Sequence, residues 1–164
     1  MNVIVATDRL WGIGKDGNIP WHISEDMKFF KKMTTGKVVI MGRKTMESFP
    51  NKKPLPNRVN IVLTKNPDYT CDGAIVVHSV EELLEKTKDY DDEDLFVIGG
   101  GQIYNLLMSY CGTAYVTRID KVFDTDAKFP NLYSMKCWEE TSVSEFKEEN
   151  GIRFNFCTFK HSFK

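Results

Sequence analysis

The stretch 19–30 reads Ile-Pro-Trp-His-Ile-Ser-Glu-Asp-Met-Lys-Phe-Phe and places a carboxylate beside an apolar stripe. Ser24 is a favourable N-cap residue, so we expect a helix over about 24–33. One face of that helix would carry Asp26, Met27, Phe30 and Met33. Two interpretations of Asp26 stay open. Either it complements the positive end of the helix dipole, as Glu25 does, or it is a site residue whose pKa is raised by apolar surroundings.

The composition is typical of an ordinary soluble protein. The chain has 164 residues, of which 41% are hydrophobic, and we expect one domain over 1–164. A formal net charge of -1 gives no general attraction to nucleic acid or to an anionic membrane. No apolar run approaches the ~18 residues of a membrane span. Any anion-binding site must therefore be local.

The cysteines and histidines show no metal-binding pattern. Cys71, Cys111, Cys137 and Cys157 form no CxxC pair, and the three histidines have no ligand spacing with them. We therefore expect reduced thiols and no bound metal. A strand is expected from Asn2 onward, which leaves no room for a signal peptide. These features together predict a cytoplasmic protein.

Short apolar runs predict an α/β fold around a mixed, mainly parallel sheet of eight strands. The expected strands include 3–6, 37–41, 59–63, 74–78, 95–98 and 114–119. Residues 152–159 alternate apolar and polar, which predicts an antiparallel C-terminal hairpin. About four flanking helices are expected, at 24–33, at 43–49, after Ser79 in a capping box, and at 102–108.

Residues 8–18 form a glycine-rich segment between the first expected strand and the first helix. Gly12, Gly14 and Gly17 leave little to bury, although Trp11 and Ile13 are apolar. Long loops in compact domains are often lids over a site, and a plain surface loop is the alternative.

Three expected strands end in groups that suit phosphate. The ends are Gly42-Arg43-Lys44-Thr45, Leu63-Thr64-Lys65 and Gly99-Gly100-Gly101. In open parallel sheets ligands bind at the carboxyl ends of the strands. Together these ends suggest a dinucleotide with an extra monoester phosphate, as in NADPH. Solvated side chains at Arg43 and Lys44, or a tight packing turn at the glycines, are the alternatives.

The chain resembles the bacterial dihydrofolate reductases over its whole length. Each motif is modest alone, but their order and spacing together are specific. The matching residues are Ile13-Gly14, Pro20-Trp21, Asp26, Met41-Gly42-Arg43-Lys44-Thr45, Pro54-Leu55-Pro56-Asn57-Arg58, Val97-Ile98-Gly99-Gly100-Gly101, Tyr104 and Phe129-Pro130. The resemblance implies that family's fold and a monomer.

The resemblance also implies NADPH-dependent reduction of 7,8-dihydrofolate to tetrahydrofolate. Asp26 would bind the pterin and favour protonation of N5, through a water near Trp21, with Thr117 supporting the carboxylate. Arg58 would pair with the α-carboxylate of the folate glutamate tail. The implied substrate-binding residues are Ile4, Val5, Asp26, Met27, Phe30, Phe49, Leu55, Arg58, Ile98 and Thr117.

The implied cofactor site spans several segments. Its residues are Ala6, Ile13, Gly14, Asn18, Ile19, Gly42, Arg43, Lys44, Thr45, Leu63, Thr64, Lys65, Gly99, Gly100, Gly101, Gln102, Ile103 and Tyr104. Arg43, Thr64 and Lys65 would hold the 2′-phosphate. The resemblance further implies a cis peptide bond between Gly99 and Gly100.

Some residues depart from the family pattern. Ile19 stands where methionine or leucine is common, Gln102 where some relatives have arginine, and 124–127 reads Asp-Thr-Asp-Ala where relatives often have Gly-Asp-Thr. Two other functions remain as alternatives: a reductase of the same fold acting on a ribosylaminopyrimidine in riboflavin synthesis, and a non-catalytic nucleotide-binding module. Asp26 separates them, because a mere binder has no use for a carboxylate in an apolar cleft.

Overall fold

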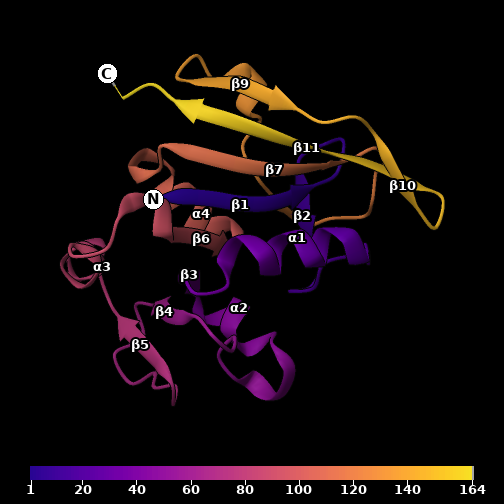
Figure 1. Cartoon of the computed structure of the whole chain (residues 1–164). Helices are drawn as coiled ribbons and strands as arrows, with labels where there is room; N and C mark the ends of the chain where they lie inside the picture. The colour runs from indigo at the N-terminus through magenta and orange to yellow at the C-terminus, as the bar shows by residue number, and fades with distance from the viewer. Residues whose placement is uncertain (164) are drawn as a thin grey trace.

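The computed structural model describes residues 1–163 and centres on a sheet of nine strands (Figure 1). They are β1 (Asn2–Thr7), β3 (Val38–Gly42), β4 (Val59–Leu63), β5 (Ala74–Val77), β6 (Leu95–Gly99), β7 (Thr113–Ile119), β9 (Trp138–Val143), β10 (Lys147–Glu149) and β11 (Ile152–His161). Eight lie in the order β10-β11-β7-β1-β6-β3-β4-β5, and β9 pairs with β11. The pairs from β7 to β5 are parallel, whereas β11 is antiparallel to β7, β9 and β10. The predicted mixed sheet with an antiparallel C-terminal hairpin is confirmed.

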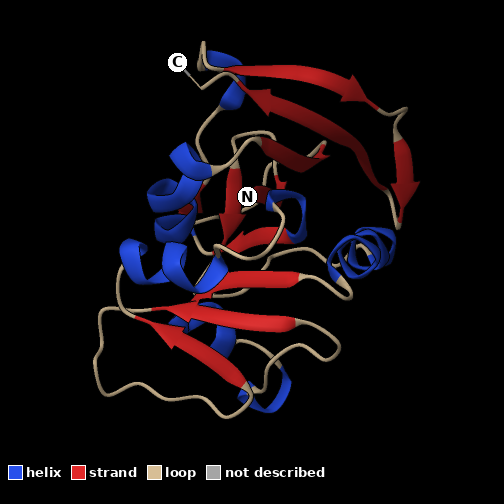
Figure 2. Cartoon of the chain, turned by 60° about the vertical axis from the view of Figure 1, so that its left-hand side comes forward, coloured by secondary structure: helices blue, strands red, loops and turns tan. Residues whose placement is uncertain are grey.

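Four α-helices lie within residues 1–163, and Figure 2 shows helices on both faces of the sheet. They are α1 (Ser24–Thr34), α2 (Arg43–Glu47), α3 (Val80–Thr87) and α4 (Gly101–Leu107). Single 3-10 turns occur at Pro50–Lys52, Asp92–Asp94, Met108–Tyr110 and Leu132–Ser134. None of the helices in this part of the chain combines the length and the apolar composition that crossing a membrane requires.

The central strands are buried on both faces, as their continuous apolar runs predict. In β3, Val38 and Ile40 pack in the core cluster that includes residues of α3 and α4. Val39 and Met41 point the other way and pack with Met46 of α2. The sheet therefore has an α3/α4 face and an α2 face.

The strand register brings the carboxyl ends of β3, β4 and β6, which carry the predicted phosphate-binding residues, to one edge of the sheet. Met41 lies opposite Gly99, and Gly42 lies opposite Leu63. Because β6, β3 and β4 are neighbouring parallel strands, the segments that follow them begin side by side. The Gly99–Gly100 peptide bond is cis, as the resemblance implied.

The segment 8–18 is not wholly a loop, contrary to prediction. β2 (Gly12–Gly14) pairs with β8 (Ala127–Lys128) in a separate two-stranded ribbon. A Cβ atom on Gly12 would lie 2.4 Å from Thr125 Oγ1, so only glycine leaves room for that side chain. Asp16 N–H also donates to Asp126 Oδ2 at 3.0 Å. The two segments therefore form one unit, held by both backbone and side chains.

The predicted N-cap of α1 is wrong. Ile23 occupies the N-cap position, and Ser24 is the first helical residue. The acceptor for the first turn comes instead from Glu149, on β10. A contact between residues so distant in sequence leaves no local signal. α2 is also shorter than predicted, since it ends at Glu47.

Candidate active site

Asp26 on α1 and Thr117 on β7 meet on the side of the sheet away from α3 and α4. Thr117 Oγ1 donates a hydrogen bond of 2.6 Å to Asp26 Oδ1. Thr117 is buried and Asp26 is partly buried. The structure therefore brings together the two polar residues that the resemblance paired.

The surroundings of Asp26 favour its neutral form more than water does. Burial raises the pKa of the Asp26 carboxyl above its ordinary value, and the hydrogen bond from Thr117 opposes that shift. A carboxylic acid with a raised pKa in a cleft is a candidate for proton chemistry. The site interpretation of Asp26 is thus favoured over the helix-dipole interpretation.

Partly buried apolar side chains gather on the α2 face of the sheet. Phe49, Leu55 and Ile98 are partly buried and pack against the cluster formed by β3, β4 and Met46. Met27 is largely exposed, and Phe30 is partly buried. Exposed apolar groups beside a partly buried acid are suited to a flat heterocycle.

Val5 does not share this face. Its side chain packs in the core cluster on the α3/α4 side of the sheet, whereas Ile4 is absent from that cluster. Successive side chains of a strand point to opposite faces. Val5 would therefore reach a ligand on the Ile4 side of the sheet only through its backbone, and its place in the substrate site stays a prediction.

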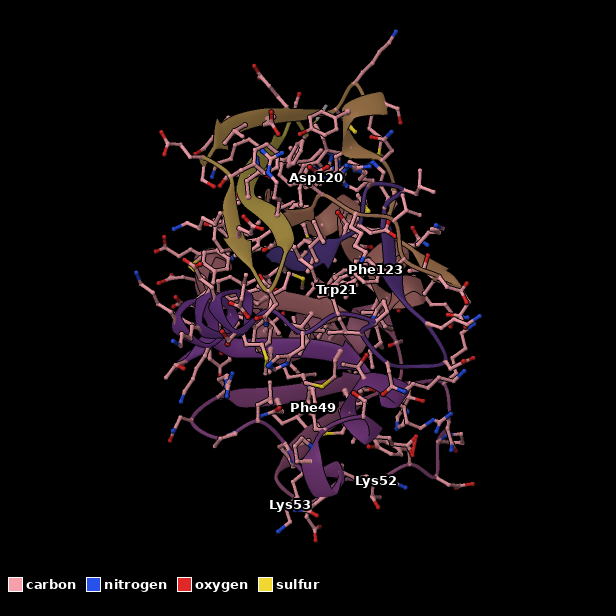
Figure 3. The ribbon with its side chains drawn as sticks, turned by 90° about the vertical axis from the view of Figure 1, so that its right-hand side faces the viewer. Trp21, Phe49, Lys52, Lys53, Asp120 and Phe123 are labelled. Atoms are coloured by element: carbon pink, nitrogen blue, oxygen red, sulfur yellow. The ribbon has the colours of Figure 1, made fainter. Side chains whose placement is uncertain are left out.

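Trp21 lies just before α1, next to Phe123 from the loop that follows β7 (Figure 3). The ring centroids are 5.2 Å apart at an interplanar angle of 55°. Figure 3 also shows Phe49 below Trp21, with Lys52 and Lys53 beyond it. Ile19, two residues before Trp21, is largely exposed.

Arg58 is oriented by the end of α1. Its Nη1 donates to Thr34 Oγ1 and its Nε to Pro56 O, both at 3.0 Å. Among the ion pairs within residues 1–163, none involves Arg58. Partial burial lowers the pKa of its guanidinium, but an arginine stays charged at neutral pH. An oriented, unpaired guanidinium is suited to bind a carboxylate.

The starts of α2 and α4 lie against each other at the edge of the sheet. A Cβ atom on Gly42 would be 3.0 Å from Ile103 Cγ1, and one on Gly100 would be 3.8 Å from Thr45 Oγ1. No side chain within residues 1–163 caps either helix. Uncapped backbone N–H groups therefore meet beside Thr45, an arrangement that suits a pyrophosphate.

Cations flank this edge, and one of them has a partner. Arg43 forms an ion pair with Glu47, one helical turn along α2. A cation at a helix start opposes the helix dipole, and this pair partly offsets the charge of Arg43. Lys44 and Lys65 are exposed, and Thr64 is partly buried at the end of β4.

Tyr104 and Leu63 lie below the surface of the predicted cofactor site. Tyr104 is buried, and its hydroxyl donates to Ile4 O at 2.8 Å. Its ring supports Gly99 from below, since a Cβ atom there would be 3.4 Å from it. Burial raises the pKa of Tyr104, and the nearby Asp26 carboxylate adds to the shift.

The β2–β8 ribbon lies next to the glycine turn. A Cβ atom on Gly101 would be 3.5 Å from Lys128 O and 3.8 Å from Ile13 Cδ1. Gly14 and Asn18 lie at the tip of the ribbon, where Lys15 and Asn18 form a bridge. Ala6 is partly buried on β1, on the same side of that strand as Ile4.

Sequence reasoning missed Asp8. Its side chain is fully buried and accepts hydrogen bonds from Leu10 N–H and Gly12 N–H at 2.8 Å, and from Phe123 N–H at 3.0 Å. Asp8 therefore joins the segment that leads into β2 to the segment that leads into β8. An aspartate directly after a buried strand was the available signal, but it did not reveal the distant partner.

The geometry agrees with comparisons to known proteins. A sequence model of the family described as dihydrofolate reductase matches residues 1–161. The chain is 44% identical over 162 residues to the dihydrofolate reductase of Bacillus subtilis, covering 98% of this chain and 94% of that one. Identity to the Staphylococcus aureus enzyme of that name is 35% over 158 residues, covering 95% and 94%.

A solved structure shares the arrangement. It is a dihydrofolate reductase from Enterococcus faecalis complexed with NADP(H) and RAB-propyl, with a TM-score of 0.88 and 36% identity. The match covers 98% of this chain and 95% of that one. On the family match, the relatives and the shared fold, the chain belongs to the dihydrofolate reductase family.

Proposed function

We propose that this chain reduces 7,8-dihydrofolate to 5,6,7,8-tetrahydrofolate with NADPH and so supplies one-carbon metabolism. The observation that carries the proposal is the Asp26 carboxylate, held by Thr117 on the face of the sheet that adjoins the phosphate-friendly strand ends. Membership of the dihydrofolate reductase family favours this activity over reduction of a ribosylaminopyrimidine and over nucleotide binding without catalysis.

Asp26 would act on the pterin ring as both anchor and electrostatic partner. Its carboxylate would accept hydrogen bonds from the 2-amino group and an adjacent ring N–H. Its negative charge would favour protonation of N5, with the proton passing through a water held near Trp21. A proton at N5 and a hydride at C6 together reduce the C=N bond.

The rest of the substrate would follow the α2 face outward. Ile4, Met27, Phe30, Phe49, Leu55 and Ile98 would contact the pterin and aminobenzoyl rings. Arg58 would then bind the α-carboxylate of the glutamate tail, since Thr34 at the end of α1 already holds its guanidinium in place.

The strand-end residues fit NADPH, which when bound supplies the hydride. Backbone N–H groups of Gly100, Gly101, Gln102 and Ile103 would bind the pyrophosphate with Lys44 and Thr45, around Gly42 and Gly99. Arg43, Thr64 and Lys65, next to Leu63, would bind the 2′-phosphate. Ala6, Ile13, Gly14, Asn18 and Ile19 would border the nicotinamide, with Tyr104 supporting the turn.

We also propose that residues 1–164 form a single domain that acts as a cytoplasmic monomer. Every residue proposed for the site comes from one copy of the chain. All four cysteines are free thiols in the structure, which suits a reducing compartment. Size-exclusion chromatography with light scattering would test the monomer.

The test of the activity is the loss of NADPH absorbance on adding dihydrofolate to the purified protein. We expect rapid oxidation that requires both compounds and yields tetrahydrofolate. A rate equal to that of buffer would contradict the proposal. NADPH binding without turnover would instead favour a nucleotide-binding module.

A further inference from the structure

The hairpin formed by β10 and β11 projects from the edge of the sheet toward the start of α1 (Figure 1). Its turn is tight, since Asn150 and Gly151 both have positive φ, 53° and 79°. Two consecutive residues with positive φ are typical of a two-residue hairpin turn of fixed twist. The position of Glu149, the last residue of β10, is therefore well defined.

Glu149 binds the first turn of α1. Its carboxylate accepts hydrogen bonds from Ser24 N–H at 2.7 Å, Ser24 Oγ at 2.9 Å and Glu25 N–H at 3.2 Å. Lys147 Nζ, on the same strand, lies 3.1 Å from Glu25 Oε1. Because the N-cap residue Ile23 has no side-chain acceptor, β10 supplies the cap that the helix lacks.

These contacts close a ring around Asp26. Asp26 accepts from Thr117 on β7, and Thr117 lies opposite Phe156 on β11. β11 follows β10 through the tight turn, and Glu149 of β10 binds the two residues directly before Asp26. The Phe29 ring of α1 also lies 4.7 Å from that of Phe156. Helix and strand are thus fixed to each other on both sides of the carboxylate.

We infer that Glu149 is a positioning residue for the reaction, which holds the first turn of α1 so that Asp26 stays against Thr117 and faces the pterin. The inference rests on the proposed function. Glu149 does not touch the substrate in this account, and its effect passes through Ser24 and Glu25.

The negative charge of Glu149 acts on the start of α1 and, through it, on Asp26. Hydrogen bonds from Ser24 and Glu25 lower the pKa of Glu149, and the titratable side chains near it are His22, Lys147 and Glu25. The side chain is therefore an anion at neutral pH and offsets the positive end of the helix dipole. Without it, that positive end would stabilise ionised Asp26 and lower its pKa.

The test compares Glu149→Ala with Glu148→Ala, which removes the same charge from the neighbouring, exposed residue of β10. Glu149→Ala is expected to raise KM for dihydrofolate about fivefold, the equivalent of one lost helix cap. It should also move the midpoint of the pH profile of kcat/KM to lower pH. Glu148→Ala should match the wild type, and Glu149→Gln, which keeps one acceptor oxygen, should recover part of the KM effect.

Two outcomes would overturn the inference. A lower Tm for Glu149→Ala, with KM and pH profile equal to those of Glu148→Ala, would show a purely structural role and overturn the inference. If the alanine variant does not fold, the same comparison is made between Glu149→Gln and Glu148→Gln. Absence of dihydrofolate-dependent NADPH oxidation in the wild type would overturn the proposed function itself, and with it this inference.

Discussion

Thr117 Oγ1 donates to Asp26 Oδ1 over 2.6 Å, and this hydrogen bond links β7 to α1. Within residues 1–163, this hydrogen bond is the side-chain contact that opposes the effect of burial on the pKa of Asp26. The bond therefore sets how readily the carboxyl is ionised when substrate binds.

Thr117→Val is expected to raise the pKa of Asp26, because the isosteric side chain removes a donor to the charged form. The midpoint of kcat/KM against pH should move upward. Thr117→Ser keeps a hydroxyl and should leave the midpoint near that of the wild type. Equal profiles for valine and wild type would show that the bond does not tune Asp26.

Asp26→Asn should reduce turnover at pH 7 by roughly 10²-fold or more, the usual contribution of a group that assists proton transfer. The loss should shrink in acid, where solvent protonates the substrate. Single-turnover measurements across pH would show this. Asp89→Asn, the same substitution at an exposed residue in the loop after α3, is the matched control and should keep the activity of the wild type.

The same Asp26→Asn variant should be more stable than the wild type at neutral pH. Since the folded pKa of Asp26 lies above its unfolded value, the wild type loses stability as pH rises from the unfolded pKa through the folded one. Asparagine does not titrate, so the gap between the two proteins should widen over that interval and then stay constant. Urea unfolding at several pH values would measure it, and a gap that widens toward acid would contradict the raised pKa.

Arg58→Lys should raise KM for dihydrofolate about tenfold, because lysine cannot form two parallel hydrogen bonds to a carboxylate. KM for NADPH should not change. A dihydropteridine without the glutamate tail is the control substrate, and wild type and variant should reduce it equally well. A matching loss with the truncated substrate would place Arg58 outside the tail site.

Arg43→Ala should reduce the preference for NADPH over NADH by about tenfold, as expected for one lost charge-assisted contact. The change also leaves Glu47 without its partner, and that carboxylate would repel a 2′-phosphate. Arg43→Ala with Glu47→Gln should therefore regain part of the preference. Ratios of kcat/KM for the two cofactors measure the effect, and Lys52→Ala serves as a distant control. An unchanged ratio in Arg43→Ala would remove Arg43 from the 2′-phosphate site.

The strands and the proximity of three strand ends could be predicted from local sequence. Apolar runs indicated the strands, and the glycines and cations that follow three of them lie together because parallel strands end at one edge of a sheet; that they bind phosphate stays a prediction. Helical spacing placed Asp26 beside apolar residues. The pairing of Asp26 with Thr117 came only from the resemblance, since nothing local links them.

The sequence alone determined the parallel strands and the presence of four helices, since these patterns depend on neighbours a few residues apart, but not the β2–β8 ribbon or the N-cap of α1. Only the tertiary structure decided that Glu149 caps α1 and that Asp8 joins the segments leading into β2 and β8. It also decided that the side chain of Val5 lies on the α3/α4 face of the sheet and that of Ile4 on the other. Alternation shows that two neighbours face opposite ways, but not which face carries the site. Hydrogen bonds between residues more than a hundred positions apart depend on how the layers pack, and packing is a property of the whole chain.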